Sequence, residues 1–164
     1  MFKKGDFVVS SANGICEITD VVTMNMSGSN KDYYLLIPLE EQTAKVYIPV
    51  DVAEKRIRNI LSKEQAWEII RSIPNIKECW VENEKERERF YKDALASREP
   101  ERLIGIIKNM YNRRQARLDA GKKSTAVDER YFKLAENQLH AELAFAIGEE
   151  KKNIKSIIME HFCG

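Results

Sequence analysis

The spacing of the hydrophobic residues changes once along the chain, near Ile60, and this change most constrains the fold. Before it, β-branched residues alternate in short runs separated by turn residues, which is typical of antiparallel strands. After it, apolar residues recur every three or four positions, which is typical of amphipathic helices. The sequence therefore predicts an α+β protein with a β domain over residues 1–58 and a helical domain over residues 59–164.

The first domain shows the pattern of short strands joined by tight turns. Asn13-Gly14 tolerates positive φ angles and is a strong hairpin signal, and a second turn is expected over residues 25–32. Four strands in so short a stretch predict a small antiparallel sheet or barrel. The strands are expected over residues 6–10, 14–24, 32–39 and 43–49.

The second domain shows start and stop signals for five helices. The first helix is expected between Ser62, which opens a Ser62-x-x-Gln65 capping box, and Pro74, which cannot continue a helix. The other helices are expected over residues 81–96, from Pro100 to Gly121, from Thr125 to Gly148, and over residues 150–162.

The sequence contains no recognisable catalytic or metal-binding motif. The chain has no glycine-rich phosphate loop, no dinucleotide-binding glycine pattern and no Gly-x-Ser-x-Gly elbow. His140 lies mid-helix, where a partly exposed helix residue explains it better than a general base. Cys16, Cys79 and Cys163 are widely spaced, which argues against a zinc site or a disulfide framework. We expect no catalysis, no cofactor and no small-molecule substrate.

The distribution of apolar residues bears on location. The N-terminal lysines are not followed by an apolar run, so no secretory signal is visible. No window approaches the roughly 18 apolar residues of a membrane span. We therefore expect a cytoplasmic protein with no membrane partner.

Basic residues are concentrated in one part of the helical domain. Residues 98–123 hold eight Lys or Arg against three Asp or Glu, in a chain whose net charge is only +1. Such a cluster can bind phosphates, or it can simply complement a helix C-terminus in solvent. The candidate DNA-binding residues at this helix end are Arg113, Arg114, Arg117, Lys122 and Lys123.

Trp80 directly precedes the most highly charged predicted helix. One interpretation is a hydrophobic contact that packs the start of this helix onto the core. The other is an exposed aromatic wedge near Arg87 and Arg89, which is the combination that opens a base step from the minor groove. The sequence leaves both interpretations open.

Several stretches, in this order, resemble one protein family. FKKGDFVVSSANGICEI, DYYLLIPL and KVYIPVDVA resemble the RNA-polymerase-interacting module of the CarD family, which also occurs in transcription-repair coupling factors. ERERFYKDALASREPERLIGIIKNMYNRRQ and GKKSTAVDERYFKLAENQLHAELAFAIG are similar to the CarD C-terminal helical domain. The resemblance covers nearly the whole chain and implies a bacterial transcription regulator.

The resemblance implies a fold and two partners. It implies a small Tudor-like antiparallel β-barrel that docks on the lobe of the RNA polymerase β subunit, followed by an all-α C-terminal domain. In the family, an aromatic wedge and basic side chains of that domain contact the minor groove and backbone of promoter DNA at the upstream edge of the −10 region. The resemblance implies that this contact does not depend on the base sequence and stabilises the open complex, and that polymerase brings the protein to the nucleoid.

The resemblance also assigns DNA-contacting positions. Aligned without gaps, the basic positions of the family fall on Arg87 and Arg89, and a later one falls on or beside Arg130. The wedge position falls on Glu84, one helical turn after Trp80.

The polymerase-contacting positions of the β domain fall on Met24 and Tyr47, which are often arginine in the family. Tyr47 belongs to the last long predicted strand, whose edge is a candidate for strand addition by a partner. We therefore assign polymerase binding to Met24, Lys45, Val46, Tyr47 and Ile48.

The combined prediction is a transcription regulator that binds polymerase through the first domain and promoter DNA through the second. The alternative is a polymerase-bound adaptor that does not contact DNA and whose basic cluster is merely solvated. Salt-dependent binding to a DNA duplex would separate the two.

Overall fold

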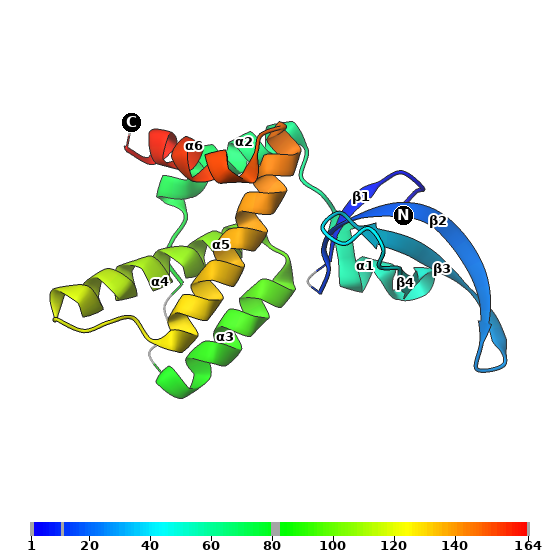
Figure 1. Ribbon diagram of the computed structural model, residues 1–164, viewed down its shortest axis with the longest axis horizontal. Helices are drawn as coiled ribbons and strands as arrows, with labels where there is room; N and C mark the ends of the chain where they lie inside the picture. The colour runs from blue at the N-terminus through cyan, green and yellow to red at the C-terminus, as the bar shows by residue number, and fades with distance from the viewer. Residues whose placement is uncertain (1, 11, 80–82, 164) are drawn as a thin grey trace. The chain divides into compact units, whose positions relative to one another are not determined.

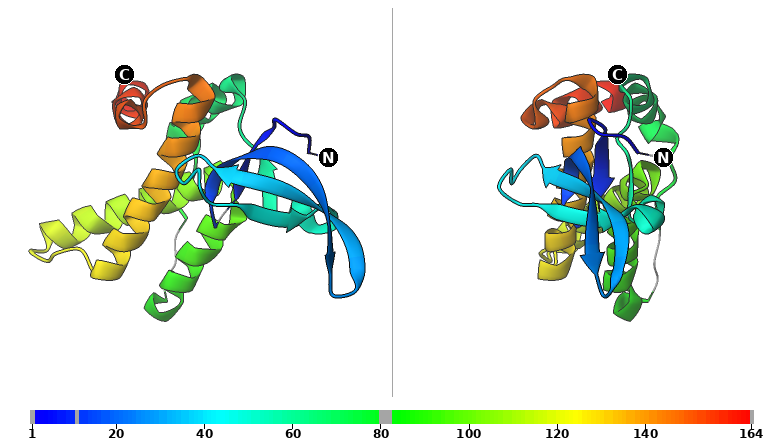
Figure 2. Two further views of the ribbon diagram at one scale, coloured as in Figure 1. Left: turned by 45° about the vertical axis from the view of Figure 1, so that its right-hand side comes forward. Right: turned by 90° about the vertical axis from the view of Figure 1, so that its right-hand side faces the viewer.

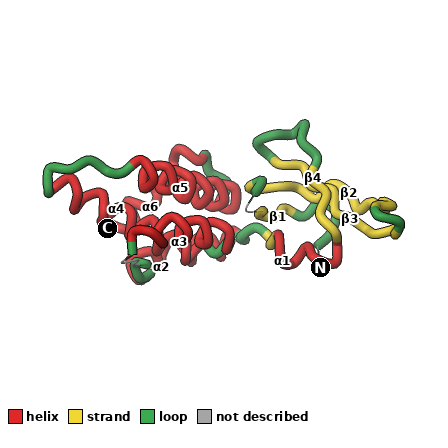
Figure 3. The backbone as a smooth tube through the Cα atoms, turned by 90° about the horizontal axis from the view of Figure 1, so that it is seen from below, coloured by secondary structure: helices red, strands yellow, loops and turns green. Residues whose placement is uncertain are grey.

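The computed structural model describes residues 2–10, 12–79 and 83–163. The chain divides into two compact units, Met1–Ile60 and Leu61–Gly164. The strands gather in the first unit and the long helices in the second (Figures 1 and 3). The predicted fold class, α+β with an antiparallel sheet before the helices, is confirmed. Within the described ranges, no helix is long and apolar enough to cross a membrane.

The first unit is a five-stranded antiparallel sheet with the strand order β4-β3-β2-β1-β5. A 3-10 turn and the short helix α1 (Ala53–Arg56) connect β4 to β5. The sequence predicts four strands and misses β5, because three residues are too few to show an alternation and the strand forms through its pairing with β1. The strands are β1 (Phe7–Ser10), β2 (Gly14–Met26), β3 (Ser29–Pro38), β4 (Val46–Pro49) and β5 (Ile57–Asn59).

Strands β2 and β3 continue beyond the rest of the sheet as a two-stranded ribbon (Figure 2). Their pairing runs on to Met26 and Ser29, whereas β1 pairs only with the start of β2 and β4 only with the end of β3. Ser27 and Gly28 make the turn, with φ angles of 59° and 81°. The prediction of a turn over residues 25–32 is therefore wrong in length, because both strands extend through most of those residues.

The hydrophobic core of the first unit follows from the period of two in its strands. Along β3, Tyr34 and Leu36 are buried, while Leu35 and Ile37 between and after them are only partly buried. Every element of the unit apart from the 3-10 turn supplies a fully buried residue. The core consists of Val8, Cys16, Ile18, Tyr34, Leu36, Ile48, Ala53 and Ile57.

The second unit contains the five predicted helices. Ser62 accepts a hydrogen bond from the Gln65 amide, and the Gln65 side chain accepts one from the Ser62 amide, so the predicted capping box is present. Thr125 caps α5, and Gly148 ends it with a φ angle of 75°. The helices are α2 (Lys63–Ser72), α3 (Glu84–Ser97), α4 (Pro100–Asp119), α5 (Ala126–Ile147) and α6 (Lys151–Cys163).

Helix α5 runs through two separate cores of the second unit. Its C-terminal half, with Leu139 and Leu143, packs with α2 and α6. Its N-terminal half, with Tyr131 and Ala135, packs with α3 and α4. Because α5 belongs to both cores, and α4 also contributes Ile104 to the core with α2 and α6, the helices are held on a common support. This support positions the charged side chains of α3, α4 and α5.

Candidate binding surfaces

Strand β4 is an edge of the sheet in the first unit. It pairs with β3, with Tyr47 opposite Leu35, and no other strand of the described chain lies beyond it. The Tyr47 side chain is 40% exposed, and Lys45, just before the strand, is also exposed. An unpaired edge of this kind presents backbone N–H and C=O groups to a partner strand.

The other residues assigned to polymerase binding lie in different surroundings. Ile48 is buried in the core of the unit, so its side chain is not available to a partner. Val46 is partly buried and packs against the same core. Met24 lies on the β2–β3 ribbon, opposite Lys31. The structure therefore places the predicted polymerase contacts in two groups, the β4 edge and the ribbon.

A buried carboxylate contacts two of the predicted DNA-binding arginines. Asp128, near the start of α5, is 4% exposed. Its Oδ2 accepts a hydrogen bond from Arg113 Nε at 2.7 Å, and its Oδ1 lies 3.4 Å from Arg87 Nε. The Tyr91 hydroxyl donates to Oδ1 at 3.1 Å. This cluster of four side chains, the Asp128 cluster, joins α3, α4 and α5.

The electrostatics of the Asp128 cluster explain how a carboxylate can be buried. Burial raises the pKa of Asp128, but hydrogen bonds with Arg113 and Thr125 and the charges of Arg113 and Arg87 outweigh it, so the pKa lies below its usual value. The side chains of Arg87 and Arg113 are only 11% and 19% exposed. A buried charge is tolerated when it is paired and hydrogen-bonded. Arg87 and Arg113 thus stabilise the helical unit and offer little surface to DNA.

Two further predicted arginines are also engaged within the protein. Arg114 forms a bidentate pair with Glu129 at 2.8 and 2.7 Å and stacks over the Phe132 ring at 4.9 Å. Arg117 donates from Nε to the Lys123 carbonyl at 2.8 Å and so closes the turn after α4. The count of charges over residues 98–123 missed the pair with Glu129 because Glu129 follows that window.

The remaining predicted cations are exposed. Arg89, Lys122 and Lys123 lie on the surface of the unit. The Arg130 side chain is 59% exposed, although it contacts Glu88 at 2.8 Å and lies over the Tyr131 ring at 4.8 Å. These four residues are the members of the predicted set whose charge faces solvent.

The segment that leads to Trp80 is fixed to α4. The Cys79 amide donates to the Gly105 carbonyl at 3.1 Å, and the two oxygens of Glu78 accept hydrogen bonds from Asn109 and Asn112. Gly105 permits this close approach, because a Cβ there would lie 2.5 Å from Cys79 Sγ. Trp80 itself lies outside the described residues, and its role as a wedge or a core contact stays a prediction.

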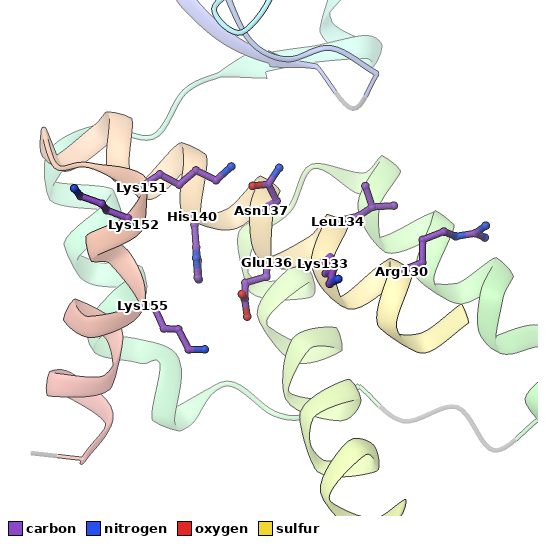
Figure 4. A pocket seen from close by; sticks show the side chains of 9 residues that line it. All are labelled: Arg130, Lys133, Leu134, Glu136, Asn137, His140, Lys151, Lys152 and Lys155. Atoms are coloured by element: carbon purple, nitrogen blue, oxygen red, sulfur yellow. The ribbon is translucent and has the colours of Figure 1, made fainter. Parts of the chain in front are cut away.

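A basic groove lies between α5 and α6 (Figure 4). Its volume is about 890 Å³, and Glu136 is the carboxylate among its lining residues. The His140 side chain points into the space between the two helices, towards the side on which Lys155 projects from α6. Four of its five cations are not among the residues that the sequence predicts to bind DNA. They come from two helices whose packing against each other the sequence does not reveal. The cations are Arg130, Lys133, Lys151, Lys152 and Lys155.

Comparison with known proteins identifies the first unit. Residues 2–61 match the family model described as CarD-like/TRCF RID domain. A search of the curated proteins found no match to the chain. The RNA-polymerase-interacting domain supports RNA polymerase binding and a role in transcription. The resemblance predicted from the β half is thus confirmed, and residues 2–61 form a CarD-like/TRCF RID domain.

Proposed function

We propose that this protein is a non-catalytic transcription regulator that binds the β subunit of RNA polymerase through its first unit and contacts promoter DNA through its helical unit. The contact lies near the upstream edge of the −10 region and modulates the stability of the open complex. The match of residues 2–61 to the polymerase-interacting domain carries this proposal. The protein acts in the bacterial cytoplasm and reaches the nucleoid through polymerase.

The β4 edge is the proposed docking site for the β subunit. Its free backbone groups allow strand addition, in which main-chain hydrogen bonds supply affinity and flanking side chains supply specificity. Tyr47 is exposed on this strand and Lys45 directly precedes it. Both side chains therefore flank the proposed junction and are available to the partner.

Docking on polymerase explains why a modest basic surface is sufficient. The net charge of the whole chain is +1, so long-range attraction to DNA is weak. Tethering to polymerase raises the effective concentration of the helical unit at the promoter. Contacts with the phosphate backbone can then act without reading the base sequence.

The second candidate is an adaptor that binds polymerase without touching DNA. The observation that favours it is the engagement of Arg87, Arg113, Arg114 and Arg117 within the helical unit. Under this alternative the exposed cations are only solvated by water and bind no DNA.

Two measurements with the full chain separate these candidates. The affinity of Tyr47→Ala for polymerase holoenzyme should fall, whereas Tyr111→Ala, which truncates an exposed tyrosine of α4, should bind as the wild type does. Photo-crosslinking from promoter DNA upstream of the −10 region should label the helical unit when polymerase is present. Docking without any DNA crosslink would favour the adaptor, and equal affinity of both tyrosine variants would exclude the β4 edge.

A further inference from the structure

We propose that the groove between α5 and α6 binds the sugar-phosphate backbone of duplex DNA. This inference rests on the proposed function and names the surface of the helical unit that makes the DNA contact. The surface differs from the arginine-rich end of α4 that the charge pattern of the sequence indicates.

The charge of the groove is only partly compensated, since Arg130 pairs with Glu88 and Lys152 with Glu150. Five cationic side chains line it against the single carboxylate of Glu136. Among the described residues, Lys133, Lys151 and Lys155 take part in no salt bridge. The arginines at the end of α4 differ in this respect, since Arg113 and Arg114 already hold carboxylates. The groove is therefore where phosphates would meet Lys133, Lys151 and Lys155, three cations outside any salt bridge among the described residues.

The cations lie along both walls of the groove. On α5, the lining extends over about 15 Å from Arg130 to His140, and its two cations, Arg130 and Lys133, lie within the first turn of that stretch. On α6, Lys151 and Lys155 are four residues apart, so they occupy one face of the helix. A length of about 15 Å parallel to the duplex axis corresponds to about four phosphates of one DNA strand. The two walls together match an extended anionic chain better than a single small anion.

The lining residues favour duplex backbone over other anionic partners. The described lining contains no Phe, Tyr or Trp on which single-stranded bases would stack. Leu134 is its one large apolar residue, whereas a groove for an amphipathic peptide needs several apolar pockets. Four of the cations are lysines, which bind phosphate as point charges and lack the planar fork that reads guanine. Binding without sequence specificity follows.

The test compares two full-length variants that each remove two positive charges. Lys151→Gln/Lys155→Gln alters the groove, and Lys122→Gln/Lys123→Gln alters the exposed turn after α4. Affinity for a short duplex is measured over a range of salt concentrations, with promoter and scrambled sequences. Polymerase binding is measured for each variant as a control for folding and docking.

The groove variant should lose affinity by about tenfold or more for both sequences, and its slope of log affinity against log salt should fall by about 0.9 for each lost contact. The turn variant should lose much less affinity than the groove variant, and both should dock on polymerase. Equal loss in the two variants, or loss only in the turn variant, would overturn the groove assignment and leave the proposed function standing. A wild-type chain that neither binds duplex nor crosslinks to promoter DNA in the polymerase complex would refute both.

Discussion

Arg113 Nε donates a hydrogen bond to Asp128 Oδ2 across 2.7 Å and thereby joins α4 to α5. Arg87 from α3 lies near the other carboxylate oxygen of Asp128, so one buried carboxylate connects three helices. This relationship changes how the basic residues of the chain are understood. Two arginines that look like DNA contacts in the sequence hold the helical unit together.

Replacement of Asp128 should therefore destabilise the protein. Asp128→Asn removes the charge while keeping the shape of the side chain, and it leaves Arg87 and Arg113 without their buried partner. The free energy of unfolding should fall by about 3 kcal/mol at neutral pH, as when one partner of a buried ion pair is removed. Chemical denaturation measures this loss. A loss smaller than that of an exposed-site control such as Asp93→Asn would contradict the structural role.

The same cluster predicts a dependence of stability on pH. Because the pKa of Asp128 in the folded protein lies below its usual value, its contribution is fully present above about pH 4 and is lost as the pH falls through the folded pKa. The stability difference between wild type and Asp128→Asn should therefore shrink in acid. A difference that stays constant from neutral pH down to pH values well below the usual Asp range would argue against an ionised Asp128.

A substitution at Gly105 tests whether the segment before Trp80 packs closely against α4. An alanine Cβ would lie 2.5 Å from Cys79 Sγ and 3.0 Å from the Lys77 carbonyl. Overpacking of this kind costs about 1–3 kcal/mol, which offsets the gain of about 1 kcal/mol that alanine gives a helix. Gly105→Ala should speed hydrogen exchange at the Cys79 amide, and Cys79→Ala in the same chain should restore part of the protection. Slower exchange in Gly105→Ala would contradict the close packing.

In the helical half, local sequence patterns predict where the helices begin and end. Ser62, Thr125 and Gly148 act where capping rules place them, because caps depend on a few neighbouring residues. β5 was missed because its formation depends on pairing with β1, which is distant in sequence.

The binding surfaces were harder to predict because they too depend on contacts between residues that are distant in sequence. The partners of Arg113 and Arg114 lie on another helix, and Lys133 lines one groove with lysines of α6 only through tertiary packing.

Cys16 should be unreactive in the folded protein. It is fully buried in the core of the first unit, and burial raises the pKa of its thiol to about 11. Since the thiolate is the reactive form, alkylation at neutral pH should require unfolding of this unit. Mass spectrometry of labelled peptides can compare Cys16 with Cys79, which is partly exposed. Rapid modification of Cys16 under native conditions would contradict the buried sheet core.

His140 provides a local readout of the groove. Burial lowers its pKa; Glu136 raises it, and Lys151 and Lys155 lower it further, so the pKa of the folded protein lies below its usual value. A bound phosphate would offset the two lysine charges, so duplex DNA should raise the His140 pKa. Lys151→Gln/Lys155→Gln should raise it already in the free protein and reduce the response to DNA. NMR titration of the His140 ring measures both effects, and a pKa unchanged by saturating duplex would place the DNA elsewhere.

The lifetime of the open promoter complex, measured with purified polymerase and full-length protein, tests the central claim most directly. The wild-type protein should change this lifetime, Tyr47→Ala should require a higher concentration for the same effect, and Lys151→Gln/Lys155→Gln should dock on polymerase yet change the lifetime less. Wild-type protein that binds polymerase without altering the lifetime, or variants that act as the wild type does at every concentration, would contradict the account.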